Sequence, residues 1–111
     1  MRLQTEIFGD VLVAHAPDDL VEETIDTLIK TVRSAIEDGQ VKVVAQLDRT
    51  ETYDSAALTA LLDLRDELRQ AGGNLKVCGL GEPGRTIFRI TRLNREVDVF
   101  DSVIDAVSSY R

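Results

Sequence analysis

Asp54 and Ser55 are the two adjacent residues whose types and order could do chemistry at the surface of this chain. They precede an amphipathic run, so Asp54 is placed to cap a helix and Ser55 to be its first residue. A phosphate on that serine would add about −1.5 to −2 units of charge near the positive end of the helix dipole. The pair is therefore either a phosphorylation switch or a plain cap. Spacing alone favours the cap, because Asp and Ser are common capping residues.

A buried strand and a long helix must position this pair. Residues 41–47 (VKVVAQL) are apolar on both faces, which is typical of a central strand in a parallel sheet. The following helix is predicted to begin at Ser55 and to end at Gly72 and Gly73, which can adopt a left-handed backbone. Its apolar stripe has spacings of three and four and consists of Ala57, Leu58, Leu61, Leu62, Leu64 and Leu68.

Strands and helices alternate along the rest of the chain. Residues 3–7 and 11–14 predict a hairpin through Gly9-Asp10, and a first helix is expected from Pro17-Asp18-Asp19 to Gly39. A strand at 75–78 precedes a third helix, which is expected to open at Glu82-Pro83 and to carry Ile87, Phe88, Ile90 and Leu93 on its apolar side. A last strand at 97–100 leads to a final helix capped by Asp101 or Ser102, with Val103, Ile104, Ala106 and Val107 on its apolar side.

This order, β-β-α-β-α-β-α-β-α, requires a largely parallel sheet with right-handed crossovers. We therefore expect a single α/β domain over residues 1–111, with a mixed, largely parallel sheet, an N-terminal hairpin and about four helices. The length of 111 residues suits one core, and 43% hydrophobic with 30% charged residues indicates a globular chain.

The charge balance limits the partners. A net charge of −7 argues against nucleic acid and anionic membranes. No apolar run approaches the ~20 residues that a membrane span requires. The first ten residues lack the build of a signal peptide, and Cys78 is the only cysteine, so we expect a cytoplasmic protein.

Three catalytic or cofactor-binding alternatives lack their residues. A receiver domain needs an acidic pair after its first strand and a lysine after its last strand, and neither is present. The GLGEPG loop has no following Lys-Ser or Lys-Thr, so it does not match a P-loop. His15 and Cys78 have no further ligands at zinc-binding spacing. We therefore expect neither an enzyme nor a bound cofactor or metal.

Several longer segments are similar to a known family. LDRTETYDSAAL at 47–58, the amphipathic helix after it and AGGNLKVCGL at 71–80 resemble the STAS domain of bacterial anti-sigma factor antagonists. GRTIFRITRLNREVDVFDSVIDAV at 84–107 resembles the family's third helix, last strand and final helix. The resemblance implies the STAS fold for the whole chain.

The resemblance also implies a function. Such proteins capture an anti-sigma factor that is also a serine kinase, which frees a sigma factor for transcription. Phosphorylation of the serine at the start of the second helix dissolves the complex, and a phosphatase resets it. Ser55 occupies that position, and the kinase would carry ATP and magnesium. The implied partner-binding residues are Asp48, Thr52, Tyr53, Asp54, Ser55, Ala56, Ala57 and Leu58. Burial under the turn is the alternative for Tyr53.

The chain departs from the family pattern at three places. Ala57 and Arg92 stand where the family often has glycine. Ala16-Pro17-Asp18-Asp19 replaces a Gly-Glu-Leu-Asp loop that helps to form the partner face. These departures leave a second hypothesis open, in which the chain is a STAS scaffold, or a subunit of a stress-signalling or transport complex, that is not phosphorylated.

Overall fold

The computed structural model describes residues 3–111 and has a five-stranded sheet with helices on both faces. The strands are β1 (Thr5–Phe8), β2 (Val11–His15), β3 (Asp19–Leu20), β4 (Lys42–Gln46), β5 (Thr52–Tyr53), β6 (Asn74–Cys78) and β7 (Asp98–Phe100). The helices are α1 (Ile25–Glu37), α2 (Ser55–Gln70), α3 (Glu82–Ile90), α4 (Leu93–Glu96) and α5 (Val103–Ser108).

The sheet order is β1-β2-β4-β6-β7, with only the β1–β2 pair antiparallel. The predicted α/β fold, with its N-terminal hairpin and largely parallel sheet, is therefore confirmed. β4 is the central strand, and its side chains alternate between two cores. Val43 and Ala45 face the larger core and Val44 the smaller one, as the apolar run of residues 41–47 predicts.

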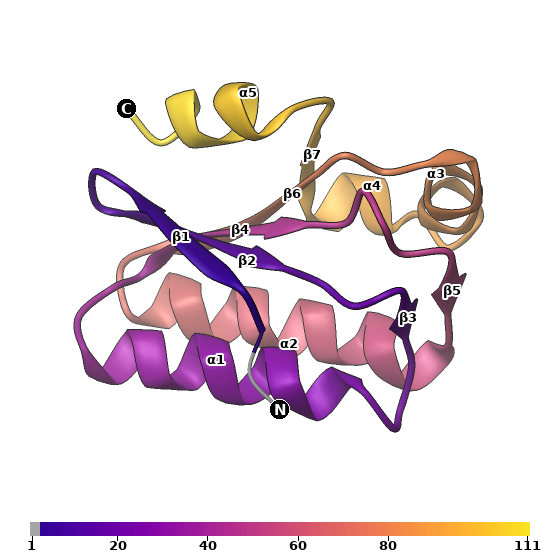
Figure 1. Cartoon of the computed structure of the whole chain (residues 1–111), viewed down its shortest axis with the longest axis horizontal. Helices are drawn as coiled ribbons and strands as arrows, with labels where there is room; N and C mark the ends of the chain where they lie inside the picture. Colours follow the sequence, from indigo (N-terminus) through magenta and orange to yellow (C-terminus); the bar gives the residue numbers. More distant parts are fainter. Residues whose placement is uncertain (1–2) are drawn as a thin grey trace.

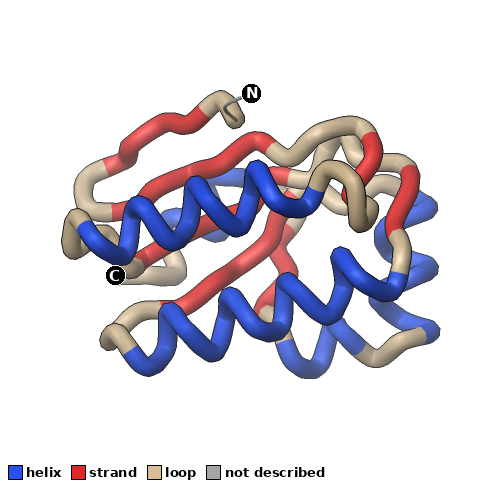
Figure 2. Tube along the Cα trace, turned by 90° about the horizontal axis from the view of Figure 1, so that it is seen from below, coloured by secondary structure: helices blue, strands red, loops and turns tan. Residues whose placement is uncertain are grey.

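The two sheet faces are covered unequally. α1 and α2 lie side by side under one face, and the short α5 lies over the other (Figures 1 and 2). The larger core includes leucines of both long helices that are almost fully buried, namely Leu28, Leu61, Leu64 and Leu68. The smaller core consists of Val11, Val13, Val44, Cys78 and Ala106.

The first helix begins later than its sequence predicts. Residues 17–24 are not helical, and α1 starts at Ile25. Asp19–Leu20 instead form β3, which pairs in parallel with β5. The Leu20 side chain is fully buried in the larger core. Tertiary burial thus overrides the helical start signal of Pro17-Asp18-Asp19.

The predicted third helix is in fact two helices, α3 and α4. The described chain therefore has five helices and not the expected four. α3 ends at Ile90, and the chain turns through Arg92, which has φ 62° and ψ 20°. The turn buries Leu93 in α4 and leaves Ile90 68% exposed. Ile90 is therefore wrongly placed on the buried stripe by its spacing. The same holds for Ile104 of α5, which is 76% exposed.

Candidate functional site

Asp54 and Ser55 have the geometry that their sequence predicts. Asp54 is the N-cap of α2, where its Oδ1 accepts a hydrogen bond from the backbone N–H of Ala57 at 2.9 Å. Ser55 is the first helical residue and is exposed. Its hydroxyl therefore lies at the positive end of a 16-residue helix and is open to a partner.

Asp54 also ties the start of α2 to the loop that precedes α1. Its Oδ2 accepts from the backbone N–H of Glu22 at 2.8 Å, and its own N–H donates to the Leu20 carbonyl at 3.3 Å. Each carboxylate oxygen is thus engaged by an amide from a different segment. The side chain fixes the position of Ser55 relative to residues 20–22, which a simple cap would not do.

The pairing of β3 with β5 brings residues 16–19, the loop that departs from the family pattern, to the end of the molecule where α2 begins. Glu51 N–H donates to the Asp18 carbonyl at 2.8 Å, and the Thr50 hydroxyl donates to the Pro17 carbonyl at 2.7 Å. Asp19 pairs with Thr52 in the register of β3 and β5. Residues 17–22 therefore lie near the start of α2. Asp18 of this segment pairs with Arg49 at 3.4 Å, whereas the carboxylates of Asp19 and Glu22 have no ion pair within residues 3–111.

Tyr53 packs between the start of α2 and α3. Its ring packs edge-on against Phe88 of α3, with centroids 6.1 Å apart. Burial raises the pKa of the Tyr53 phenol to about 12, so the hydroxyl stays neutral at physiological pH. That hydroxyl finds no hydrogen-bond partner among the described residues. A Cβ on Gly84 would lie 2.8 Å from it, so the ring requires a residue without a side chain there.

The proposed partner-binding residues divide by exposure. Asp48, Thr52, Ser55 and Ala56 are exposed, and Tyr53, Asp54 and Leu58 are partly exposed. Ala57 is fully buried in the larger core, so its methyl group faces the sheet and not a partner. The predicted partner-binding role of Ala57 is therefore not supported by an exposed side chain.

Asp48 lies where β4 ends, against the loop that follows β6. The position of a Cβ on Gly79, which has φ +75°, would be 3.2 Å from the Asp48 Cβ. Burial, with a smaller contribution from the Asp48 charge, raises the pKa of the Cys78 thiol to about 11. Cys78 is therefore a protonated core residue and not a reactive thiolate.

Sequence reasoning missed Leu20, Glu22 and Gly84 as parts of this site. Leu20 and Glu22 hydrogen bond through their backbones, which leaves no mark in residue type. Gly84 carries a weak signal, because a glycine inside a helix costs stability and usually has a packing reason.

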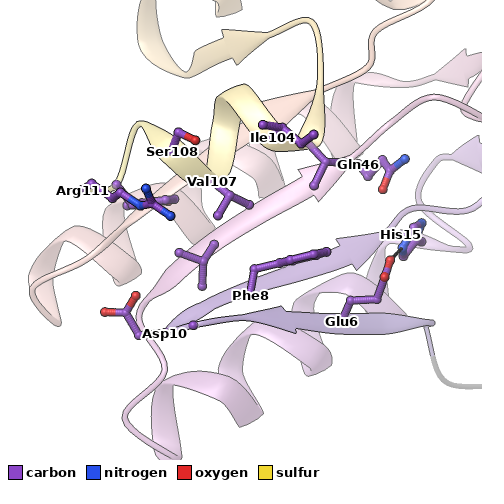
Figure 3. Close-up of a pocket in the computed structure, with 13 residues that line it drawn as sticks. Glu6, Phe8, Asp10, His15, Gln46, Ile104, Val107, Ser108 and Arg111 are labelled. Atoms are coloured by element: carbon purple, nitrogen blue, oxygen red, sulfur yellow. Dashed lines mark hydrogen bonds and ion pairs between the residues drawn. The ribbon is translucent and has the colours of Figure 1, made fainter.

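A separate groove lies on the other side of the sheet from α1 and α2. It has a volume of about 720 Å³ and runs between the β1–β2 hairpin and α5. Phe8 and Ile104 face it, and Glu6 hydrogen bonds to His15 at 2.5 Å at one end (Figure 3). None of the predicted partner-binding residues lines it.

The described part of the chain offers no cluster of three or more His, Cys, Asp or Glu side chains suited to a metal ion. Within residues 3–111 no helix combines the length and apolar character needed to span a bilayer.

The sequence model of the family described as "STAS domain" matches residues 2–106, which are nearly the whole chain. The chain belongs to the STAS domain family. A relative described as "anti-sigma F factor antagonist", from Paenibacillus polymyxa, is 22% identical over 109 residues, which are 97% of this chain and 93% of that protein.

Solved structures are similar over the same extent. An anti-sigma factor antagonist from Mycobacterium paratuberculosis superposes with a TM-score of 0.85 at 20% identity, covering 98% of this chain and 92% of that one. The Bacillus cell fate determinant SpoIIAA, in its phosphorylated form, superposes with a TM-score of 0.74 at 17% identity. The match covers 98% of this chain and 99% of that one. At these identities the likeness shows the STAS fold.

Proposed function

We propose that this STAS domain is an anti-sigma factor antagonist that binds an anti-sigma factor with serine kinase activity while Ser55 is unphosphorylated. Phosphorylation of Ser55 releases the partner, a phosphatase restores binding, and the cycle controls a sigma factor in the cytoplasm. The chain itself is a binding protein that catalyses no reaction. The observation that carries this proposal is the exposure of Ser55 as the first residue of α2.

The local electrostatics support a switch at this position. A phosphate on Ser55 would be favoured by the helix dipole, so α2 would stay folded. The same phosphate would stand beside Asp54 and close to the acidic loop at 17–22. A partner that packs on the bare hydroxyl would then meet a bulky dianion, with its desolvation cost and its repulsion of any acidic group.

Asp54 adds a structural argument. Its carboxylate is held by two backbone amides at 2.8 and 2.9 Å, so it is not free to move away from a phosphate. The charge change is therefore concentrated on one rigid surface, and no refolding is needed to weaken partner binding.

The first test is intact-mass analysis and peptide mapping of the protein from its native cells, with and without phosphatase. The proposal expects one removable phosphate on Ser55. It further expects that Ser55→Ala binds the anti-sigma factor of the same cell constitutively and that Ser55→Asp does not bind it. Ser34→Asp is the matched control, because it adds the same charge at an exposed position of α1.

Two results would reject the switch. One is the absence of phosphate on Ser55 under several growth conditions. The other is equal binding of partners by wild-type protein and Ser55→Asp. Equal binding would support the alternative hypothesis, in which this STAS domain is an unphosphorylated scaffold or subunit and Ser55 belongs only to the helix start.

A further inference from the structure

The α3–α4 segment concentrates arginines that the chain itself does not use. Arg89, Arg92 and Arg95 are exposed and make no ion pair or side-chain hydrogen bond within residues 3–111. Several basic residues elsewhere do form ion pairs, namely Lys30–Asp26, Arg33–Glu67, Lys42–Asp10 and Arg49–Asp18, while Arg69 and Lys76 form hydrogen bonds. Three free guanidinium groups within seven positions are unexpected in a chain with a net charge of −7.

Two nearby carboxylates, Glu96 and Asp101, are held by other arginines, and Glu82 and Asp98 make no ion pair with these three in the described part of the chain. Glu96 accepts from Arg65 at 3.0 Å, and Asp101 lies 3.3 Å from Arg85. Glu82 begins α3, about two helical turns away from Arg89.

Arg92 gives a second, independent observation. Its φ of 62° lies in the left-handed region, and it is the only non-glycine residue in the described part of the chain with a positive φ. A Cβ is strained in that conformation, and glycine is not. The backbone alone would therefore favour glycine at position 92. An arginine held there at a cost in strain indicates that its side chain has a use.

A groove of mixed polar and apolar lining includes one of these arginines, Arg89. It has a volume of about 290 Å³ and is lined by the apolar side chains Leu80, Phe88, Val99 and Phe100 and by the polar residues Arg85, Arg89, Asn94 and Asp101. The Asp101 carboxylate is paired with Arg85 at 3.3 Å, so Arg89 is the free charge at this groove. This volume is at the lower limit for a small-molecule pocket, and it suits a single apolar side chain. Ile90, which follows Arg89 in the sequence, is 68% exposed and adds to the apolar surface of this segment.

We propose that the α3–α4 face binds an acidic segment of a partner protein. Carboxylates of that segment pair with Arg89, Arg92 and Arg95, and one apolar side chain fills the groove. Arginine around an apolar centre is the composition typical of protein interfaces. The strongly negative remainder of the chain disfavours a nucleic acid, which would extend well beyond three arginines.

The face is close to the Ser55 site but does not depend on it. Phe88 of α3 contacts Tyr53 of β5, the strand that leads into α2. α3 and the start of α2 lie at the same end of the molecule (Figure 1). A partner on Ser55 could therefore extend onto this face, but binding of an acidic segment requires no phosphorylation of Ser55.

The test is a titration of ¹⁵N-labelled protein with the capped peptide EEDLFEDE, followed by amide chemical shifts. We expect shifts confined to residues 80–101 and an affinity that falls several-fold when salt is raised to about 0.5 M. The capped peptide KKKLFKKK should cause no shifts there. Shifts that are absent, or that centre on Lys30 and Arg33, overturn the proposal.

Variants separate binding from folding. Arg89→Gln with Arg95→Gln should weaken the peptide about tenfold. Lys30→Gln with Arg33→Gln removes two charges from α1 and should change affinity less than about twofold. Arg92→Gly should raise the melting temperature and lower affinity together. Unchanged affinity in Arg92→Gly, or equal losses in both double variants, contradicts the proposal.

Inorganic tripolyphosphate distinguishes a protein-docking face from a general anion site. The proposal expects the peptide to bind more tightly than tripolyphosphate, because only the peptide places an apolar side chain in the groove. Tighter binding of tripolyphosphate, with the same shifts, would overturn docking of a protein segment.

Discussion

The two faces of the sheet differ in how thickly helices cover them. The face under α1 and α2 buries leucines from two helices of 13 and 16 residues, and Ser55 stands at the end of this layer. The opposite face is covered by α5, a helix of six residues with one buried side chain, Ala106. That face leaves a groove of about 720 Å³ and Phe8 43% exposed.

The difference in cover implies that the α1–α2 face is rigid and that the α5 face deforms more easily. A thick apolar layer resists deformation, because its close-packed side chains have few alternative arrangements. Ser55 and Asp54 are therefore presented on the rigid side. The thin layer depends on particular polar contacts, above all those of Tyr110. The Tyr110 hydroxyl lies 2.7 Å from the carbonyls of Val43 and Asn74 and accepts from the Val43 N–H at 3.2 Å.

The largest expected effect is in the thick layer. Leu61→Ala should destabilise the fold by about 2–5 kcal/mol, because Leu61 is fully buried between α2 and the sheet. Val107→Ala on α5 is the counterpart and should cost less than about 1.5 kcal/mol, because Val107 is only partly buried. Urea unfolding measures both values, and equal losses would refute the unequal roles of the two faces.

Tyr110→Phe should cost about 1–3 kcal/mol, more than the packing of α5 alone would suggest. The substitution keeps the ring but removes the hydroxyl that bridges β4 and β6. Hydrogen exchange should show faster exchange in α5 and little change in α2. A stability within 0.5 kcal/mol of wild type would show that α5 is held by packing and not by this hydroxyl, where about 0.5 kcal/mol is the lower limit for one hydrogen bond.

Gly84→Ala should destabilise the protein by about 1 kcal/mol, because the new methyl group would approach the Tyr53 hydroxyl and the Leu80 side chain at 2.8 Å. Tyr53→Phe alone should be neutral or stabilising, since the hydroxyl is buried without a partner. Adding Tyr53→Phe should recover part of the loss in Gly84→Ala. Strict additivity in this double-mutant cycle would disprove the contact.

The smallest effect is expected at Ser55 itself. Ser55→Asp should change stability by less than about 1 kcal/mol, with a stabilising sign, because a negative charge in the first helical turn favours the dipole. Thermal unfolding at low salt measures this change, and high salt should reduce it. A large destabilisation would mean that the Ser55 end is not a rigid frame that tolerates added charge.

Much of the fold follows from periodicity in the sequence. The hairpin, the central strand, α2 with Asp54 as its cap, and the α/β order are all predicted and confirmed. These elements are long or strongly patterned, so local propensity and burial agree. The errors occur where they disagree. Residues 17–24 carry a helix start signal, but burial of Leu20 draws them into β3.

The site divides in the same way. Residue types alone identify Asp54 and Ser55, because capping depends on residues close in sequence. Gly84, by contrast, has a role that depends on Tyr53, which is 31 positions away in the sequence and adjacent only in the fold. Arg92 stands where the STAS family often has glycine, and its φ of 62° in the fold gives the physical reason for that preference.

The sequence by itself determined the α/β order of elements, the capped start of α2 and the place of Ser55, because each depends on short-range pattern and hydrophobic periodicity, and its resemblance to the STAS family indicated the type of fold. Only the tertiary structure decided that Asp54 also holds Glu22, that Ala57 faces the core, and that Arg89, Arg92 and Arg95 stand unpaired on the α3–α4 segment, with Arg89 lining a groove. These features depend on which distant segments meet, and the backbone groups and exposed charges that meet there leave little trace in hydrophobic pattern.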